Sequence, residues 1–238
     1  MTSLVGAILL RSWRSLKRET FLLILSNFTW VVASLPGWLL ISYGAVGHDL
    51  ILIIIALVAL VPWALASFGL FSLVWQIGRA RSVGFLDLFR QAWAQRRTAS
   101  VWGAANLLVI AVLYSNARFY LSADSPLGSS IWGPIMSSFF LSGIAAWVMW
   151  QMLTLPLLVR GQGGGFLRAH RQSATILATR PLDVFINVLM ILVAAFASAI
   201  VVPLGLLLGA SLVAVIADQT VGVSLGETDP EALPKAEG

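Results

Sequence analysis

The chain has 238 residues, of which 59% are hydrophobic and only 11% are charged, whereas a soluble domain typically carries about 25% charged residues. This composition excludes an ordinary soluble protein and predicts an all-α protein that crosses a membrane several times. The formal charge of +5 does not indicate nucleic-acid binding, because the basic residues lie between long apolar runs, and the absence of cysteine excludes disulfides.

The first predicted element is an amphipathic helix over residues 4–19. Apolar residues recur on one side at helical spacing, and Arg11, Arg14, Lys17 and Arg18 occupy the other side. Such a helix lies in the membrane interface with its cations toward anionic headgroups. The alternative is a solvated basic segment that only orients the first span.

Six apolar stretches follow, and about 20 apolar residues are enough to cross the hydrocarbon core. The first four cover residues 21–43, 50–76, 101–120 and 131–159. The last apolar stretch, 182–221, would be roughly 60 Å long as a helix, about twice the core thickness. We therefore expect a fifth and a sixth span joined at Pro203 and Gly205, or one span and a re-entrant segment. Pro36 is expected to kink or end the first span.

A short sequence phrase occurs twice at a constant offset. Gly84-Phe85-Leu86 recurs as Gly165-Phe166-Leu167, and 165 − 84 = 81. A weaker third copy lies upstream, where Arg11 precedes Asn27 by 16 residues, as Arg90 precedes Asn106 and Arg171 precedes Asn187. The three copies predict a pseudo-threefold repeat of one cytoplasmic surface helix and two spans, with units at about 4–78, 83–159 and 164–221. Together the units form one transmembrane domain, 1–222, and the acidic tail, 223–238, is expected to be disordered.

The distribution of Lys and Arg predicts the topology. All of them except Arg118 fall in alternate gaps or in the tail. The positive-inside rule makes that side cytoplasmic. We therefore expect a multi-pass protein of a bacterial inner membrane with both termini in the cytoplasm.

Three segments resemble a known family. They read Asn27-Phe-Thr-Trp-Val-Val-Ala-Ser-Leu-Pro36, Phe85-Leu-Asp-Leu-Phe-Arg-Gln-Ala92 and Arg180-Pro-Leu182. Together they resemble the YesL-like family of small bacterial integral membrane proteins, a domain of unknown function, over about residues 5–220. One departure is that Gly37-Trp38 follows the proline where the family usually has Thr-x-Gly. The resemblance implies an association with carbohydrate-uptake systems and no established activity, so it transfers no catalytic residue.

Polar residues inside the predicted spans are the first group of candidate site residues. Asn27, Asn106 and Asn187 lie at similar depth in the odd-numbered spans and could converge on a polar pathway. The alternative is that each amide joins neighbouring helices by a hydrogen bond. Gln151, near a proline in the fourth span, is open to the same two interpretations.

The second group lies on the predicted cytoplasmic surface helices. Arg90 and Arg171 occupy equivalent repeat positions, and apolar residues accompany them. These apolar residues are Phe85, Phe89, Trp93 and Phe166. The group is expected to contact anionic lipid headgroups or a partner such as a membrane transporter. The alternative for the two arginines is a snorkelling cation that only fixes orientation.

No predicted span carries an ionisable residue near its centre, which argues against a proton-coupled pump. His48 and His170 fall on opposite sides of the membrane and cannot form one metal site. No catalytic constellation fits this topology, so we expect no enzyme, no metal and no cofactor. Two functions remain, an accessory or scaffold protein and a small transporter or channel for a neutral solute.

Overall fold

The computed structural model describes residues 4–47, 50–79, 81–122, 125–128, 130–161, 165–200 and 202–227. Within these residues the fold is all-helical, without a strand. The helices are α1 (Leu4–Arg18), α2 (Thr20–Gly47), α3 (Leu50–Ala59), α4 (Val61–Gly78), α5 (Phe85–Ala94), α6 (Arg96–Leu121), α7 (Trp132–Val159), α8 (Phe166–Thr179), α9 (Pro181–Ile200) and α10 (Val202–Ser224).

Four helical segments are long and apolar enough to cross a membrane, which indicates a membrane protein. They are Thr20–Tyr43, Ile55–Gly78, Arg96–Leu121 and Trp132–Val159. These segments match the first four predicted spans. Pro36 does not end the first of them, because α2 continues through it to Gly47.

The fifth and sixth predicted spans do not correspond to candidate spans of the structure. The segment Val184–Val193 of α9 forms a pair with α8 that is bent by 106°. Within α10, Leu208–Ser224 is a shorter apolar helix. Neither α9 nor α10 alone is among the four candidate spans, so the predicted six spans exceed the number that length and composition establish.

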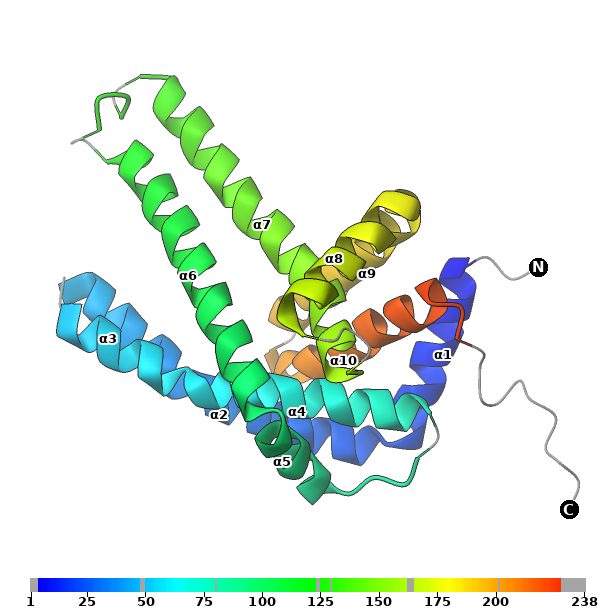
Figure 1. The fold of residues 1–238 in the computed structure, drawn as a ribbon. Coiled ribbons are helices and arrows are strands. Elements are labelled where there is room, and N and C mark those ends of the chain that lie inside the picture. Colours follow the sequence, from blue (N-terminus) through cyan, green and yellow to red (C-terminus); the bar gives the residue numbers. More distant parts are fainter. Residues whose placement is uncertain are drawn as a thin grey trace, which may run out of the picture.

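The second helices of the three predicted units meet at the centre of the fold. α4, α7 and α10 all contact one another, and α2, α6 and α9 pack against them. In Figure 1 the tips of the α2–α3 and α6–α7 hairpins point to the left. α1 and the C-terminal end of α10 lie side by side at the right. This arrangement gathers chain segments that are far apart in sequence at one end of the bundle.

Small and aromatic residues hold the central helices together. A Cβ atom on Gly103 of α6 would lie 2.7 Å from the Cβ atom of Ala64, so only glycine allows α4 and α6 to approach this closely. Beside this contact Trp102 packs its ring against Trp63 and Phe68, with centroids 5.4 and 5.7 Å away. On the outer helices large apolar side chains stay exposed, as lipid-facing residues do.

The surface helix α5 packs against α4 with a close approach of the two backbones. A Cβ atom on Gly69 of α4 would lie 2.6 Å from the carbonyl oxygen of Leu88, so glycine lets the backbone of α5 touch α4. Leu88 and Ala92 are buried in this contact. At the start of α5 the Asp87 carboxylate accepts a hydrogen bond of 2.9 Å from the N–H of Gly84, which caps the helix. The docking fixes which side of α5 faces outward.

Candidate functional site

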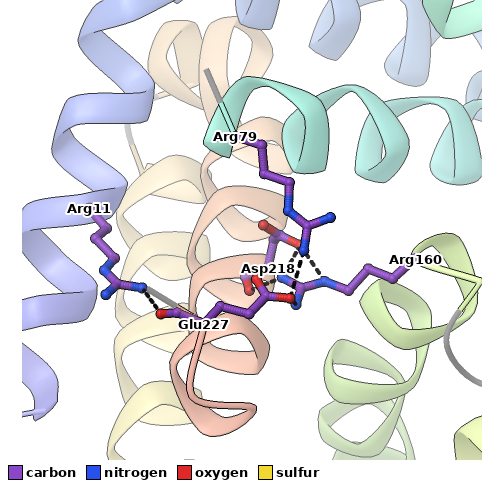
Figure 2. Close-up of polar contacts among 5 residues, drawn as sticks. All are labelled: Arg11, Arg79, Arg160, Asp218 and Glu227. Atoms are coloured by element: carbon purple, nitrogen blue, oxygen red, sulfur yellow. Dashed lines mark hydrogen bonds and ion pairs between the residues drawn. The ribbon is translucent and has the colours of Figure 1, made fainter. Parts of the chain in front are cut away.

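Five charged residues from four separate segments meet at the end of the bundle where α1 and α10 lie side by side (Figure 2). Arg11 comes from α1, Arg79 follows α4, and Arg160 follows α7. Asp218 lies in the last turns of α10, and Glu227 follows that helix. We call these five residues the arginine–carboxylate cluster. It joins the ends of all three predicted units.

The inner part of this cluster is a buried ion pair between Arg160 and Asp218. Arg160 Nε and Nη2 donate to Asp218 Oδ1 over 3.1 and 2.6 Å, and Nη2 also donates to the Asp218 carbonyl oxygen over 2.8 Å. The two side chains are only 1% and 4% exposed. A buried charge is costly unless it is paired and hydrogen-bonded. The pair therefore stabilises the contact between the C-terminal end of α7 and α10.

The outer part of the cluster is built on Glu227, whose position is set by the end of α10. Gly226 has φ +74°, its N–H donates to the Val223 carbonyl oxygen, and the Glu227 N–H donates to that of Gly222 over 2.9 Å. These bonds form a Schellman motif, in which glycine takes the left-handed conformation that ends a helix. The motif holds the backbone of Glu227 directly over the buried ion pair.

Three arginines bind Glu227. Its Oε1 accepts hydrogen bonds from Arg79 Nη2 over 2.8 Å and from Arg160 Nη1 over 2.9 Å. Its main-chain oxygen accepts one from Arg11 Nη1 over 3.0 Å. The tail, 223–238, was expected to be disordered. In the structure α10 continues to Ser224 and Glu227 is hydrogen-bonded, so residues 223–227 differ from this expectation. Residues 228–238 lie outside the described residues.

This cluster was not predicted from the sequence. Arg79 and Arg160 entered only as cations that set topology, although 160 − 79 = 81 places them at equivalent repeat positions. Asp218 could have been found as the only acidic residue near the end of the last apolar stretch. Glu227 gave no signal, because a lone carboxylate after a helix is common.

A second polar group links α6, α7 and α8. Trp102 Nε1 donates to Gln151 Oε1 over 2.9 Å, and Gln151 Nε2 lies 3.4 Å from His170 Nε2. His170 Nδ1 lies 3.0 Å from the Phe166 carbonyl oxygen, so Nδ1 carries the proton and Nε2 accepts. Thr154 Oγ1 lies 3.0 Å from Ser173 Oγ nearby. Gln151 thus joins three helices.

The predicted asparagine group does not share partners among the described residues. Asn27 Oδ1 accepts hydrogen bonds from the N–H groups of Ala210 over 2.7 Å and Ser211 over 3.2 Å, which join α2 to α10. Asn106 Oδ1 accepts one from Trp147 Nε1 over 2.9 Å, which joins α6 to α7. The side chain of Asn187 lies outside the described residues. The two described amides make the bonds that the helix-joining alternative requires.

The apolar residues of α5 fall into a buried group and an exposed group, because the helix packs against α4. Phe85 packs partly against the core, whereas Phe89 and Trp93 are 48% and 65% exposed. Arg90 is exposed beside Asp87, with Nη1 and Oδ1 3.8 Å apart. The buried side consists of Leu88 and Ala92. The helix therefore has two apolar sides, one toward the bundle and one outward.

α8 repeats the burial pattern of α5 at the offset of 81 residues. Phe166 packs partly against the core, as Phe85 does, and Arg171 is exposed, as Arg90 is. The most exposed apolar residue of each helix is also equivalent, since Leu86 and Leu167 are 78% and 82% exposed. This agreement is a structural counterpart of the sequence phrase.

The chemistry of these sites is that of charge pairing and hydrogen bonding. Within the described residues no group of three or more His, Asp or Glu side chains could hold a metal ion. Comparisons with models of protein families, with curated proteins and with solved structures find no match to this chain. The YesL-like resemblance therefore stays a prediction.

Proposed function

We propose that this protein is a non-enzymatic accessory or scaffold protein of a bacterial inner membrane, and that its cytoplasmic surface helices dock a membrane-protein partner. The proposal includes six spans, with α9 and α10 as the last two, and both termini in the cytoplasm. The observation that carries it is the outward apolar side of α5, at Leu86, Phe89 and Trp93, which the fold leaves uncovered.

The arginine–carboxylate cluster supports the topology. It brings together Arg11, Arg79 and Arg160, which belong to three of the chain segments that the positive-inside rule assigns to the cytoplasm. All three arginines bind Glu227, and this shared contact supports placing the three segments on one side of a bilayer. An odd number of spans between any two of them would separate them.

The shape of the α5 surface supports a docking role. Leu88 and Ala92 already anchor α5 to the bundle, so its outward residues are not needed for that contact. Trp93 carries the Arg96 guanidinium 5.1 Å from its ring centroid, and aromatic residues with arginine are enriched at protein interfaces. The family resemblance adds that the partner belongs to a carbohydrate-uptake system.

Site-specific crosslinking in native membranes tests the proposal, because the chain has no cysteine of its own. A photoreactive group is attached to Phe89→Cys, and the matched control carries it at Phe139→Cys, an exposed aromatic position on the spanning helix α7. We expect a protein adduct of one mass at position 89 and lipid adducts alone at position 139. Lipid adducts alone at both positions would reject docking of a protein partner.

A solute pathway through the asparagines receives no support from the described contacts. Asn27 and Asn106 bind different helices, and their Oδ1 atoms already accept hydrogen bonds. We therefore propose no transport function for these residues.

A further inference from the structure

The outer part of the arginine–carboxylate cluster has the features of an anion-binding site that is filled by the chain itself. Arg79 Nη2 and Arg160 Nη1 converge on one oxygen atom, Glu227 Oε1, at 2.8 and 2.9 Å. Both of these hydrogen bonds go to Oε1, and neither goes to the other carboxylate oxygen, Oε2. Two guanidinium groups that converge on one oxygen can serve an anion with more oxygens than a carboxylate offers.

Among the described residues, more arginines than carboxylates lie around this point. Asp218 is already paired with Arg160 in the buried part of the cluster. One more guanidinium group lies nearby, because the Trp75 ring contacts both Arg79, with Cζ 4.5 Å from the ring centroid, and Arg81, with Cζ 5.4 Å from it. Like charges held this close repel each other unless an anion lies between or beside them.

The Glu227 side chain can move away from Arg79 and Arg160 without unfolding α10. The backbone of Glu227 is fixed by the Schellman motif at Gly226, but the motif does not involve the side chain. The side chain is 26% exposed, so solvent reaches it. A change of side-chain rotamer would withdraw the carboxylate and leave the Arg79 and Arg160 donors in place.

We propose that Arg79 and Arg160, with Arg11 beside them, form a binding site for a phosphate group, and that the Glu227 carboxylate occupies this site as an internal substitute. Arginine suits phosphate because its planar donors bind two oxygens at once. The phosphate group comes from a phospholipid headgroup of the adjacent leaflet or from free phosphate in the aqueous phase.

The test compares the full-length chain with Glu227→Gln, which removes the competing charge and keeps the shape. Glu19→Gln is the matched control, because it removes a carboxylate next to α1 that is not part of the cluster. For free phosphate, thermal unfolding in detergent is followed by the fluorescence of the ten tryptophans while phosphate replaces chloride at constant ionic strength. For lipid, phosphatidylglycerol retained per chain is measured after exchange from nanodiscs with and without this lipid.

Glu227→Gln is expected to lower the half-saturating phosphate concentration about tenfold, or to retain more phosphatidylglycerol than the wild type, while Glu19→Gln matches the wild type. A gain with phosphate alone assigns the site to free phosphate, and a gain with the lipid alone assigns it to headgroups. Adding Arg79→Gln is expected to abolish the gain. In the otherwise native chain Arg79→Gln is expected to weaken binding of the same ligand.

Two results would overturn the proposal. One is equal behaviour of Glu227→Gln and Glu19→Gln in both measurements, which would make the cluster a closed set of structural ion pairs. The other is a gain that survives Arg79→Gln, which would place the bound anion elsewhere.

Discussion

Removing the buried carboxylate of the arginine–carboxylate cluster should destabilise the protein strongly. Asp218→Asn keeps the size of the side chain but removes its charge, and leaves Arg160 buried with 1% of its side chain exposed. Two of the three hydrogen bonds between these residues use Asp218 Oδ1, at 3.1 and 2.6 Å. The remaining bond, to the main-chain oxygen, does not depend on the substituted group.

The expected loss follows from the burial of the pair. Removing one partner of a buried ion pair costs about 3–5 kcal/mol, because the other charge stays buried. Arg160 keeps its bond of 2.9 Å to Glu227, so we place the loss near the lower end, at about 3 kcal/mol. Glu227→Gln should cost about 1 kcal/mol, because its side chain is 26% exposed and solvent screens its charge.

Unfolding in mixed micelles by increasing SDS, followed by tryptophan fluorescence, measures these losses. The free energy of unfolding should fall in the order Glu19→Gln, Glu227→Gln, Asp218→Asn. Replacing both partners, Arg160→Leu with Asp218→Leu, should recover most of the loss, since no unpaired charge remains. An Asp218→Asn chain within about 0.5 kcal/mol of Glu19→Gln would refute the reasoning, because that difference is typical of surface substitutions.

Three other substitutions test the helix contacts in the same unfolding assay. Gly69→Ala should cost about 1–3 kcal/mol and release α5, because its Cβ atom would lie 2.6 Å from the Leu88 carbonyl oxygen. Unchanged stability and unchanged protease resistance of α5 would contradict that contact. Asn27→Leu should cost about 1–3 kcal/mol, because two N–H groups of α10 lose their acceptor; a neutral effect would place the amide elsewhere. Gln151→Leu should cost a similar amount and shift the fluorescence of Trp102, which loses its acceptor; an unchanged spectrum would contradict the bond.

The features of the fold that repeat or extend over many residues could be predicted from the sequence. Long apolar stretches predicted the four candidate spans, because crossing a bilayer requires length and apolarity. The offset of 81 residues makes Phe85 and Phe166 equivalent in sequence and both pack partly against the core, but the threefold repeat stays a prediction. The helices outside the four candidate spans, α9 and α10, belong to the third unit, for which the sequence predicted either two spans or one span and a re-entrant segment.

The contacts between helices could not be predicted, since they depend on tertiary packing. Leu88 was absent from the predicted apolar side of α5, yet it is the residue that docks, because Gly69 lies opposite it. Asp218 stands out in the sequence as an acidic residue near the end of an apolar stretch, but only the packing of α10 against α7 shows that Arg160 is its partner. Depth in a span gave Asn27 and Asn106 a common position, but depth does not fix the neighbour to which an amide points.

The position of the surface helices relative to the bilayer tests the account most directly. Single cysteines at Arg90→Cys, Arg171→Cys and Pro126→Cys are all exposed, and the native chain contains no cysteine. A membrane-impermeant maleimide should label positions 90 and 171 from one side of the membrane, the cytoplasmic side, and position 126 from the other side. Labelling of positions 90 and 171 from opposite sides would contradict the account.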